Sequence, residues 1–172
     1  GYKVTVLTTT PHFNITSAVL KKQPLHKRFL GLFYVSDFNG VEVIHIPLKK
    51  YKSTLLRMFS FVYWHKMSFL LGLFIKKPSI ILTPSPPLTS GLLAILLAKI
   101  KGAKTIYNVQ EIYPDLLIHL GRLKSTFIIR ALKKLERWVY NGTDAITTID
   151  QQFYNTIKPR VYNPSTLSII PN

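Results

Sequence analysis

The sequence predicts an α/β fold: a Rossmann-like, mostly parallel sheet with helices on both faces. Two short apolar runs, at 79–83 and 105–109, each end in a loop rich in proline or polar residues. A helix-length apolar segment, 88–100, lies between them, and this strand–loop–helix–strand order is typical of parallel α/β units. Ligands bind at the carboxyl ends of strands in such sheets, so the loops at 83–90 and 110–115 are the first candidates for a site.

Composition limits the kinds of partner. The 172 residues are enough for one domain with a core, and we expect residues 1–172 to form a single domain. Lys and Arg number 23 against 7 Asp and Glu, a net charge of +16, which predicts an anionic partner: nucleic acid, anionic lipid or a phosphorylated substrate. The chain is also 47% hydrophobic, which favours a membrane surface. The lack of cysteine excludes disulfides and thiolate metal sites, and we expect no metal.

The first third predicts a strand, a long loop and a hairpin. Residues 3–8 alternate in the manner of a strand, and His12 and Asn14 follow in the loop at its carboxyl end, where they are candidate substrate-binding residues. Residues 15–28 have no clear period and predict a long loop. The runs 29–36 and 41–47 flank Asn39-Gly40, a strong hairpin signal.

Residues 53–77 predict one long, mainly apolar helix. At 100° per residue, one face is more polar and small (Arg57, Ser60, His65, Ser68, Gly72) and the other apolar (Leu55, Phe59, Val62, Phe69, Leu70, Leu73). Lys66 lies within the apolar face, which argues against a membrane-spanning helix. Two interpretations stay open: a packed helix with Lys66 reaching out to solvent, or a helix lying on a membrane with Trp64, Lys66, Lys76 and Lys77 in contact with it.

The second half continues the alternation of strands and helices. Thr89 or Ser90 is expected to cap the helix at 88–100, and Gly102 to end it. Residues 125–140 predict an amphipathic helix, 144–149 a strand, 151–157 a short helix and 167–170 a last strand. The amphipathic helix has a basic outer face (Arg130, Lys133, Lys134, Arg137) and an apolar repeat (Phe127, Ile128, Ala131, Leu132, Leu135, Trp138, Val139).

Six stretches together resemble one family. They are GYKVTVLTTTPHFN, NGVEVIHIPL, ILTPSPPLTSG, YNVQEIYPDLLIHLG, LERWVYNGTDAITTI and SIIPN. In this order they resemble the N-terminal half of retaining GT-B glycosyltransferases of family 4. The likeness is strongest to the subgroup in bacterial O-antigen, capsule and colanic-acid synthesis that includes the N-acetyl-L-fucosamine transferase.

The resemblance implies a function and a place in the cell. Such enzymes transfer a sugar from a nucleotide-sugar to a lipid-linked acceptor in cell-surface polysaccharide biosynthesis, lipopolysaccharide included, and this half supplies the acceptor side. The nucleotide-sugar is a substrate, so no cofactor is expected. The resemblance further implies a cytoplasmic protein held peripherally at the inner face of the bacterial plasma membrane, with an anionic membrane surface as partner.

The resemblance also implies parts that this chain lacks. The family's first strand and helix, and its C-terminal donor-binding domain, are not in these residues, so we expect the isolated chain to be inactive. The first strand would lie centrally, so we expect a sheet with a gap filled by a symmetry partner, or a rearranged strand order.

Five residues of the two loops are candidate site residues. Ser85 and Thr89 flank the start of a helix, whose N–H groups suit a phosphate or sugar oxygen, although the prolines there have a plainer use in ending a strand. Gln110 stands where many relatives have a histidine, and it is suited to hydrogen-bonding a hydroxyl. Glu111 and Asp115 are the candidate catalytic acids, as proton acceptor or acceptor contact. The plainer alternatives are that Asp115 caps a helical turn and Glu111 pairs with a neighbouring base.

Two other classes of function stay open. The same charge fits a nucleic-acid-binding domain, which requires basic residues interleaved with exposed aromatic residues on one surface; most aromatic residues here lie in apolar runs, so we expect no nucleic acid. The chain also fits an inactive, truncated remnant of an enzyme. The transferred sugar, the acceptor and any homo-oligomer are left open by the sequence.

Overall fold

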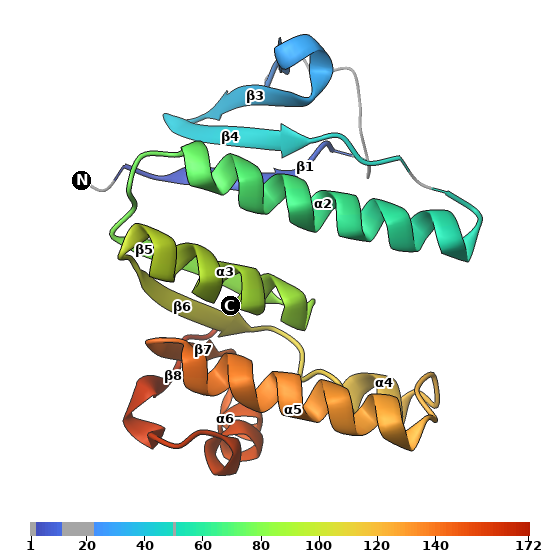
Figure 1. Cartoon of the computed structure of the whole chain (residues 1–172). Helices are drawn as coiled ribbons and strands as arrows, with labels where there is room; N and C mark the ends of the chain where they lie inside the picture. The colour runs from blue at the N-terminus through green and yellow to red at the C-terminus, as the bar shows by residue number, and fades with distance from the viewer. Residues whose placement is uncertain (1–2, 12–22, 50) are drawn as a thin grey trace. The chain divides into compact units, whose positions relative to one another are not determined.

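The computed structural model describes residues 3–11, 23–49 and 51–172, and the chain divides into two compact units, Gly1–Phe74 and Ile75–Asn172. Each unit contains one four-stranded sheet (Figure 1). The described strands therefore form two sheets. The expected gap in a single sheet, and what would fill it, stay a prediction.

The N-terminal unit is built on sheet A. Its strands are β1 (Thr5–Thr9), β2 (His26–Arg28), β3 (Phe33–Phe38) and β4 (Val41–Ile46), in the order β1-β4-β3-β2. β1 and β4 are parallel, and the other pairs are antiparallel. Asn39 and Gly40 both have positive φ, 51° and 82°, as the tight turn between β3 and β4 requires, so the predicted hairpin is confirmed.

Two sequence-based expectations in this unit are wrong. Residues 26–28 form β2 rather than loop, because they pair with β3. The expected strand at 29–36 begins only at Phe33, because Phe29 and Leu30 have positive φ and belong to the short 3-10 turn η1 (Phe29–Gly31).

A buried polar chain joins the strands of sheet A. The Gln23 Nε2 donates to the Ser36 Oγ at 2.8 Å, and the Ser36 Oγ lies 2.8 Å from the His45 Nε2. The His45 Nδ1 lies 3.3 Å from the Thr9 carbonyl oxygen. Ser36 and His45 are both buried, so the chain of contacts satisfies polar groups that burial removes from water.

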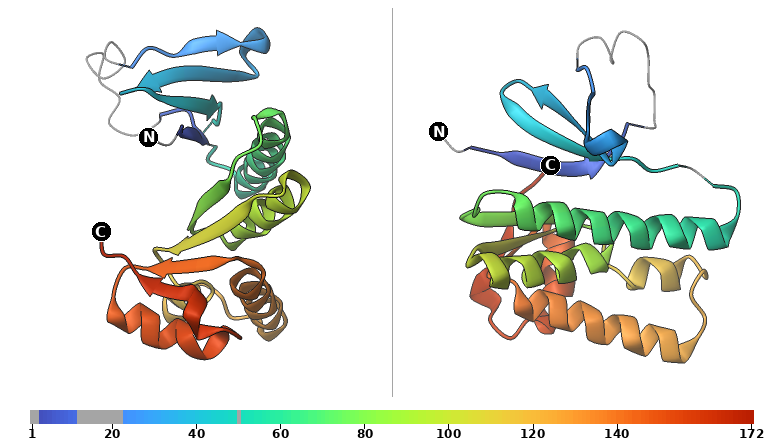
Figure 2. Two further views of the ribbon diagram at one scale, coloured as in Figure 1. Left: turned by 90° about the vertical axis from the view of Figure 1, so that its left-hand side faces the viewer. Right: turned by 45° about the horizontal axis from the view of Figure 1, so that its top comes forward.

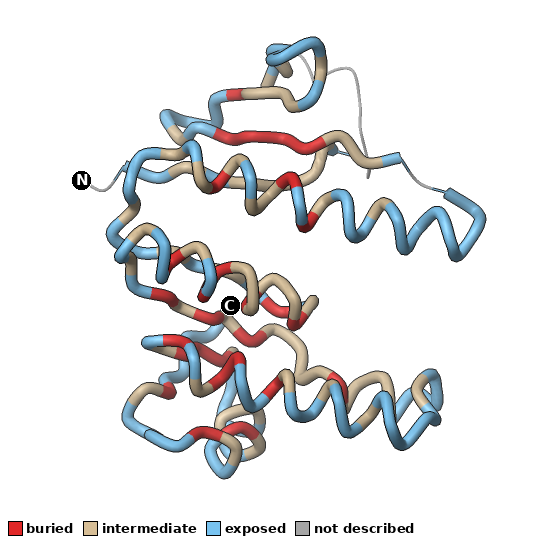
Figure 3. Tube along the Cα trace, in the orientation of Figure 1, coloured by how far each residue is buried: buried red, intermediate tan, exposed pale blue. Residues whose placement is uncertain are grey.

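The helix α2 (Thr54–Phe74) packs on sheet A with the side that the sequence marks as more polar. Its buried residues are His65, Met67 and Gly72, and it contacts β1 and β4. Of the predicted apolar face, Leu55, Phe59, Val62 and Leu70 are exposed, and Phe69 and Leu73 are half-buried. Figure 3 shows most of the first half of α2 in the colour of exposed residues. The His65 ring lies within the helix's own turn, with its Nδ1 2.8 Å from the Phe61 carbonyl oxygen.

The C-terminal unit has a fully parallel sheet B. Its strands are β5 (Ile80–Ser85), β6 (Lys104–Val109), β7 (Ala145–Thr148) and β8 (Leu167–Ile169), in that order. Its helices are α3 (Leu88–Lys101), α4 (Asp115–His119), α5 (Thr126–Gly142) and α6 (Gln151–Ile157), with 3-10 turns η2 (Lys158–Arg160) and η3 (Pro164–Thr166). Figure 2 shows α3 and α5 side by side against sheet B. These features confirm the predicted α/β, Rossmann-like fold.

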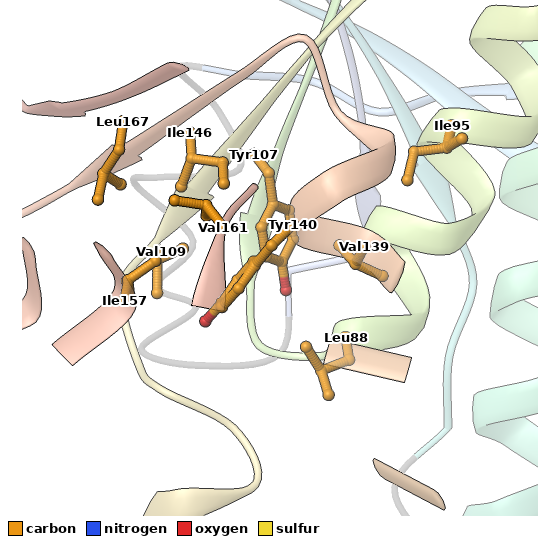
Figure 4. Close-up of a cluster of buried hydrophobic side chains, with 10 residues drawn as sticks. All are labelled: Leu88, Ile95, Tyr107, Val109, Val139, Tyr140, Ile146, Ile157, Val161 and Leu167. Carbon is orange, nitrogen blue, oxygen red and sulfur yellow. The ribbon is translucent and has the colours of Figure 1, made fainter. Parts of the chain in front are cut away.

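One hydrophobic core holds this unit together (Figure 4). Tyr107 and Val109 of β6 are completely buried between the neighbouring strands and the helices α3 and α5. Gly91 allows this close approach, since a Cβ there would lie 2.5 Å from the Val139 Cγ1 and 2.9 Å from the Tyr107 Cε2. The core members are Leu88, Ile95, Tyr107, Val109, Val139, Tyr140, Ile146, Ile157, Val161 and Leu167.

The ends of the predicted helices are only partly right. Gly102 ends α3 in a left-handed conformation, as expected. Neither Thr89 nor Ser90 caps its start, because the helix already begins at Leu88 with Pro87 in the cap position. Asp150 caps α6 by accepting a hydrogen bond from the Phe153 backbone N–H at 2.7 Å.

Candidate functional site

The carboxyl ends of three parallel strands meet at one edge of sheet B. Ser85 at the end of β5 is in register with Val109 of β6, which is in register with Thr148 of β7. The loop after β6 begins with Gln110 and Glu111, so parallel pairing brings these two residues to the same edge as Ser85. This is the edge on which ligands of open α/β sheets bind.

Ser85 ties two loops together. Its side chain is buried, and its Oγ donates to the Glu111 carbonyl oxygen at 2.6 Å. The hydroxyl therefore fixes where the Gln110–Glu111 backbone lies. Thr89 lies in the first turn of α3, half-buried and already in contact with a partner.

Gln110 belongs to a chain of side-chain amides across the strand ends. The Asn172 Nδ2 donates to the Gln110 Oε1 at 2.9 Å, and the Gln110 Nε2 donates to the Asn108 Oδ1. The Asn108 Nδ2 donates in turn to the Thr147 Oγ1 at 3.0 Å. Each amide thus has a defined orientation, and the Gln110 oxygen keeps one lone pair for a ligand.

Glu111 has the freest carboxylate at this edge. It is half-buried, and within the described part of the chain no hydrogen bond or ion pair involves its side-chain oxygens. The ion pair predicted between Glu111 and a neighbouring base is therefore not found among the described residues. A carboxylate placed in this way can accept a hydrogen bond or a proton from a ligand hydroxyl.

Asp115 is bound into an ion-pair network. Its carboxylate lies 2.5 Å from the Arg160 Nη2 and 3.0 Å from the Lys133 Nζ. The Arg160 Nη1 in turn lies 2.6 Å from the Oε1 of Glu136, which is only 2% exposed. The network joins α4, α5 and η2, so Asp115 holds together three segments that are distant in sequence. It is the first residue of α4 and forms no side-chain cap.

The pKa values of the two acids in the network are shifted in opposite directions. Burial alone raises the pKa of Asp115, but its hydrogen bonds to Arg160 and Lys133 outweigh burial, so the pKa lies below its usual value. Burial raises the pKa of Glu136 above its usual value despite the charge of Arg160. A carboxylate with a lowered pKa and two cationic partners is a poor proton acceptor, which makes Asp115 a weaker candidate base than Glu111.

The remaining candidates are distributed outside this edge. His12 and Asn14 lie outside the described residues. Trp64 is half-buried in α2, whereas Lys66, Lys76 and Lys77 are exposed. Among the described residues, no helix is long and apolar enough to cross a membrane, and no cluster of His, Asp or Glu is arranged to hold a metal ion.

Sequence reasoning missed the partners of the site residues. Asn108, Thr147 and Asn172 order Gln110, and Arg160 binds Asp115. The alternation in KTIYNV was a usable signal for Asn108, because its buried neighbours Tyr107 and Val109 require it to point to the opposite face of β6. No local pattern points to Arg160, since its partners lie on α4 and α5.

Comparison with known families gives a match over the whole chain. The model of the glycosyl transferase 4-like domain matches residues 1–172. A comparison with curated proteins found no match. The parallel sheet B with α3 and α5 packed against it is consistent with the first half of a GT-B enzyme, and so is a polar edge at the strand ends. On the family match, the chain belongs to the glycosyl transferase 4-like domain family.

Proposed function

We propose that this domain supplies the acceptor side of a glycosyl transfer from a nucleotide-sugar to a lipid-linked acceptor. The observation that carries the proposal is the half-buried Glu111 carboxylate, which has no partner among the described residues and lies at the ligand edge of sheet B. In this role it accepts a hydrogen bond from the acceptor hydroxyl and, during transfer, its proton. Gln110 orients the same acceptor through its free lone pair.

The acceptor class and the pathway are part of the same proposal. The family resemblance of the SPPL and VQEIYPD stretches supports a polyprenyl-pyrophosphate-linked acceptor in bacterial cell-surface polysaccharide biosynthesis, in the subgroup that serves O-antigen, capsule and colanic acid. The nucleotide-sugar is the donor substrate, held by a second domain outside these residues.

We further propose that the domain works at the cytoplasmic face of the plasma membrane. The net charge of +16 supports attraction to an anionic leaflet. The exposed apolar face of α2 supports a contact with the interface, with Trp64 and Lys66 on the helix and Lys76 and Lys77 just after it.

The decisive experiment measures transfer by the chain joined to a donor-binding half of the same family. Glu111→Gln is expected to lower turnover of a lipid-linked acceptor about a hundredfold or more, because the substituted amide cannot take a proton. Glu42→Gln, at an exposed carboxylate of sheet A, is the matched control and is expected to leave turnover unchanged. Equal turnover by the Glu111→Gln and unmodified enzymes would contradict the proposal.

A further inference from the structure

The outward face of α5 combines cations with exposed apolar side chains. Phe127, Ala131, Lys134 and Trp138 follow one another at helical spacing, and all are exposed. Phe127 is 82% exposed and Trp138 42%. Arg130 and Arg137 lie on the same side of this stripe at 100° per residue. We call this set of six residues the α5 face.

The α5 face has no role in the core. The residues that α5 buries are Glu136, Val139 and Tyr140, on the opposite side of the helix. The sequence assigns Phe127, Ile128, Ala131 and Trp138 to the apolar repeat expected to be inside, yet all four are exposed. The core does not need these four side chains, because Leu132 and Leu135 already supply the apolar surface next to the buried residues.

The charge on the α5 face is of one sign. Glu136 is the only acid of the described helix and points inward, where Arg160 binds it. Lys133 points to the side and pairs with Asp115. Arg130 and Lys134 have no ion-pair partner among the described residues, and Arg137 lies with its Cζ 6.0 Å from the centre of the exposed Tyr162 ring.

We propose that the α5 face binds an anionic membrane surface. Cations interleaved with Phe and Trp on one side of a helix match a surface whose headgroups are anionic and whose interface accepts aromatic rings. A second copy of the chain is a poor occupant, because like faces would bring cation against cation. The proposal deepens the proposed membrane-linked function by naming a cationic anchor distinct from the apolar face of α2.

Trp138 allows the α5 face to be tested by fluorescence. The other tryptophan, Trp64, is half-buried in α2, so Trp64→Phe leaves Trp138 as the single reporter. With vesicles of phosphatidylcholine and phosphatidylglycerol, we expect the emission of Trp138 to shift to the blue and to be quenched by brominated lipid. An unchanged Trp138 emission on bound protein would overturn the proposal.

A second experiment removes the positive charge of the α5 face. Arg130, Lys134 and Arg137 are changed together to Gln, and binding to the same vesicles at low salt is expected to weaken about a hundredfold, since each cation near the surface contributes about fivefold. Lys49→Gln, Lys99→Gln and Lys158→Gln in one control variant remove the same charge from exposed positions elsewhere, and a loss clearly smaller than that of the α5 variant is expected. Circular dichroism confirms that both variants are folded.

The outcomes separate this proposal from the proposed function. Equal binding by the two triple variants, or binding to a single-stranded oligonucleotide with none to anionic vesicles, would overturn the α5 proposal. Neither result touches the Glu111 transfer assay. Loss of transfer in Glu111→Gln with vesicle binding unchanged would in turn leave both proposals standing.

Discussion

Glu111 and Asp115 both lie in the segment that follows β6, and their surroundings are opposite. Glu111 follows β6 directly, and its carboxylate has no partner among the described residues, whereas Asp115 begins α4 and is bound by Arg160 and Lys133. The sequence treats them alike, as two acids at a ligand edge. A position near the end of a strand makes an acid a candidate for the site. Whether its carboxylate is available to a ligand depends on partners from distant segments, as the ion pairs of Asp115 show.

The largest expected effect concerns the ion-pair network that binds Asp115. Arg160→Met removes the cation from Glu136, which is left buried and unpaired, so the free energy of unfolding should fall by about 3–5 kcal/mol. Urea unfolding measures the change. Arg122→Met, at an exposed arginine of the same unit, is the control and should change stability by less than about 0.5 kcal/mol. If the two variants are equally stable, the network does not support the fold as argued.

The next effect compares the two acids directly. Asp115→Asn keeps the shape of the side chain but weakens two charge-assisted contacts, and should lower the free energy of unfolding by about 1–2 kcal/mol. Glu111→Gln should change it by less than about 0.5 kcal/mol, because no described contact is lost. Thermal and urea unfolding of both variants test this; a more destabilising Glu111→Gln would reverse the comparison.

The fold and the site differ in how much of them the sequence could predict. Apart from α4, which lies in a segment that the sequence suggests is a loop, the strands and helices of the C-terminal unit were predictable because their apolar spacing is local. Parallel pairing then placed Ser85, Gln110 and Glu111 at one edge. The side of α2 that packs inward was not predictable, since the apolar spacing marks the other side of the helix, yet His65 and Gly72 are among the buried residues. The role of Asp115 was not predictable either, because it depends on Arg160, far along the chain.

A smaller effect concerns Gln110, whose side chain has hydrogen-bond partners among the described residues, unlike that of Glu111. Asn108→Ala removes the acceptor for the Gln110 Nε2 and the donor to Thr147, and should cost about 1 kcal/mol of stability, since water replaces part of the lost contacts. In the enzyme with its donor half, the KM for the acceptor should rise more than kcat falls, because Gln110 is misoriented rather than removed. Asn155→Ala on the exposed side of α6 is the matched control, and the same KM in both variants would show that Gln110 is not positioned in this way.

The smallest effect is a dependence on pH. The pKa of Asp115 is lowered in the folded chain, so the unfolded chain takes up the proton first as the pH falls. Its contribution to stability is complete above the unfolded value near 3.8 and is lost as the pH falls below that value towards the folded pKa. Glu136 acts in the other direction. Because its pKa is raised above the unfolded value of 4.5, the folded chain takes up this proton before the unfolded chain does as the pH falls. We therefore expect the difference in stability between the unmodified chain and Asp115→Asn to shrink between about pH 5 and pH 3 in urea unfolding. A constant difference would mean that the ion pairs of Asp115 do not form in solution.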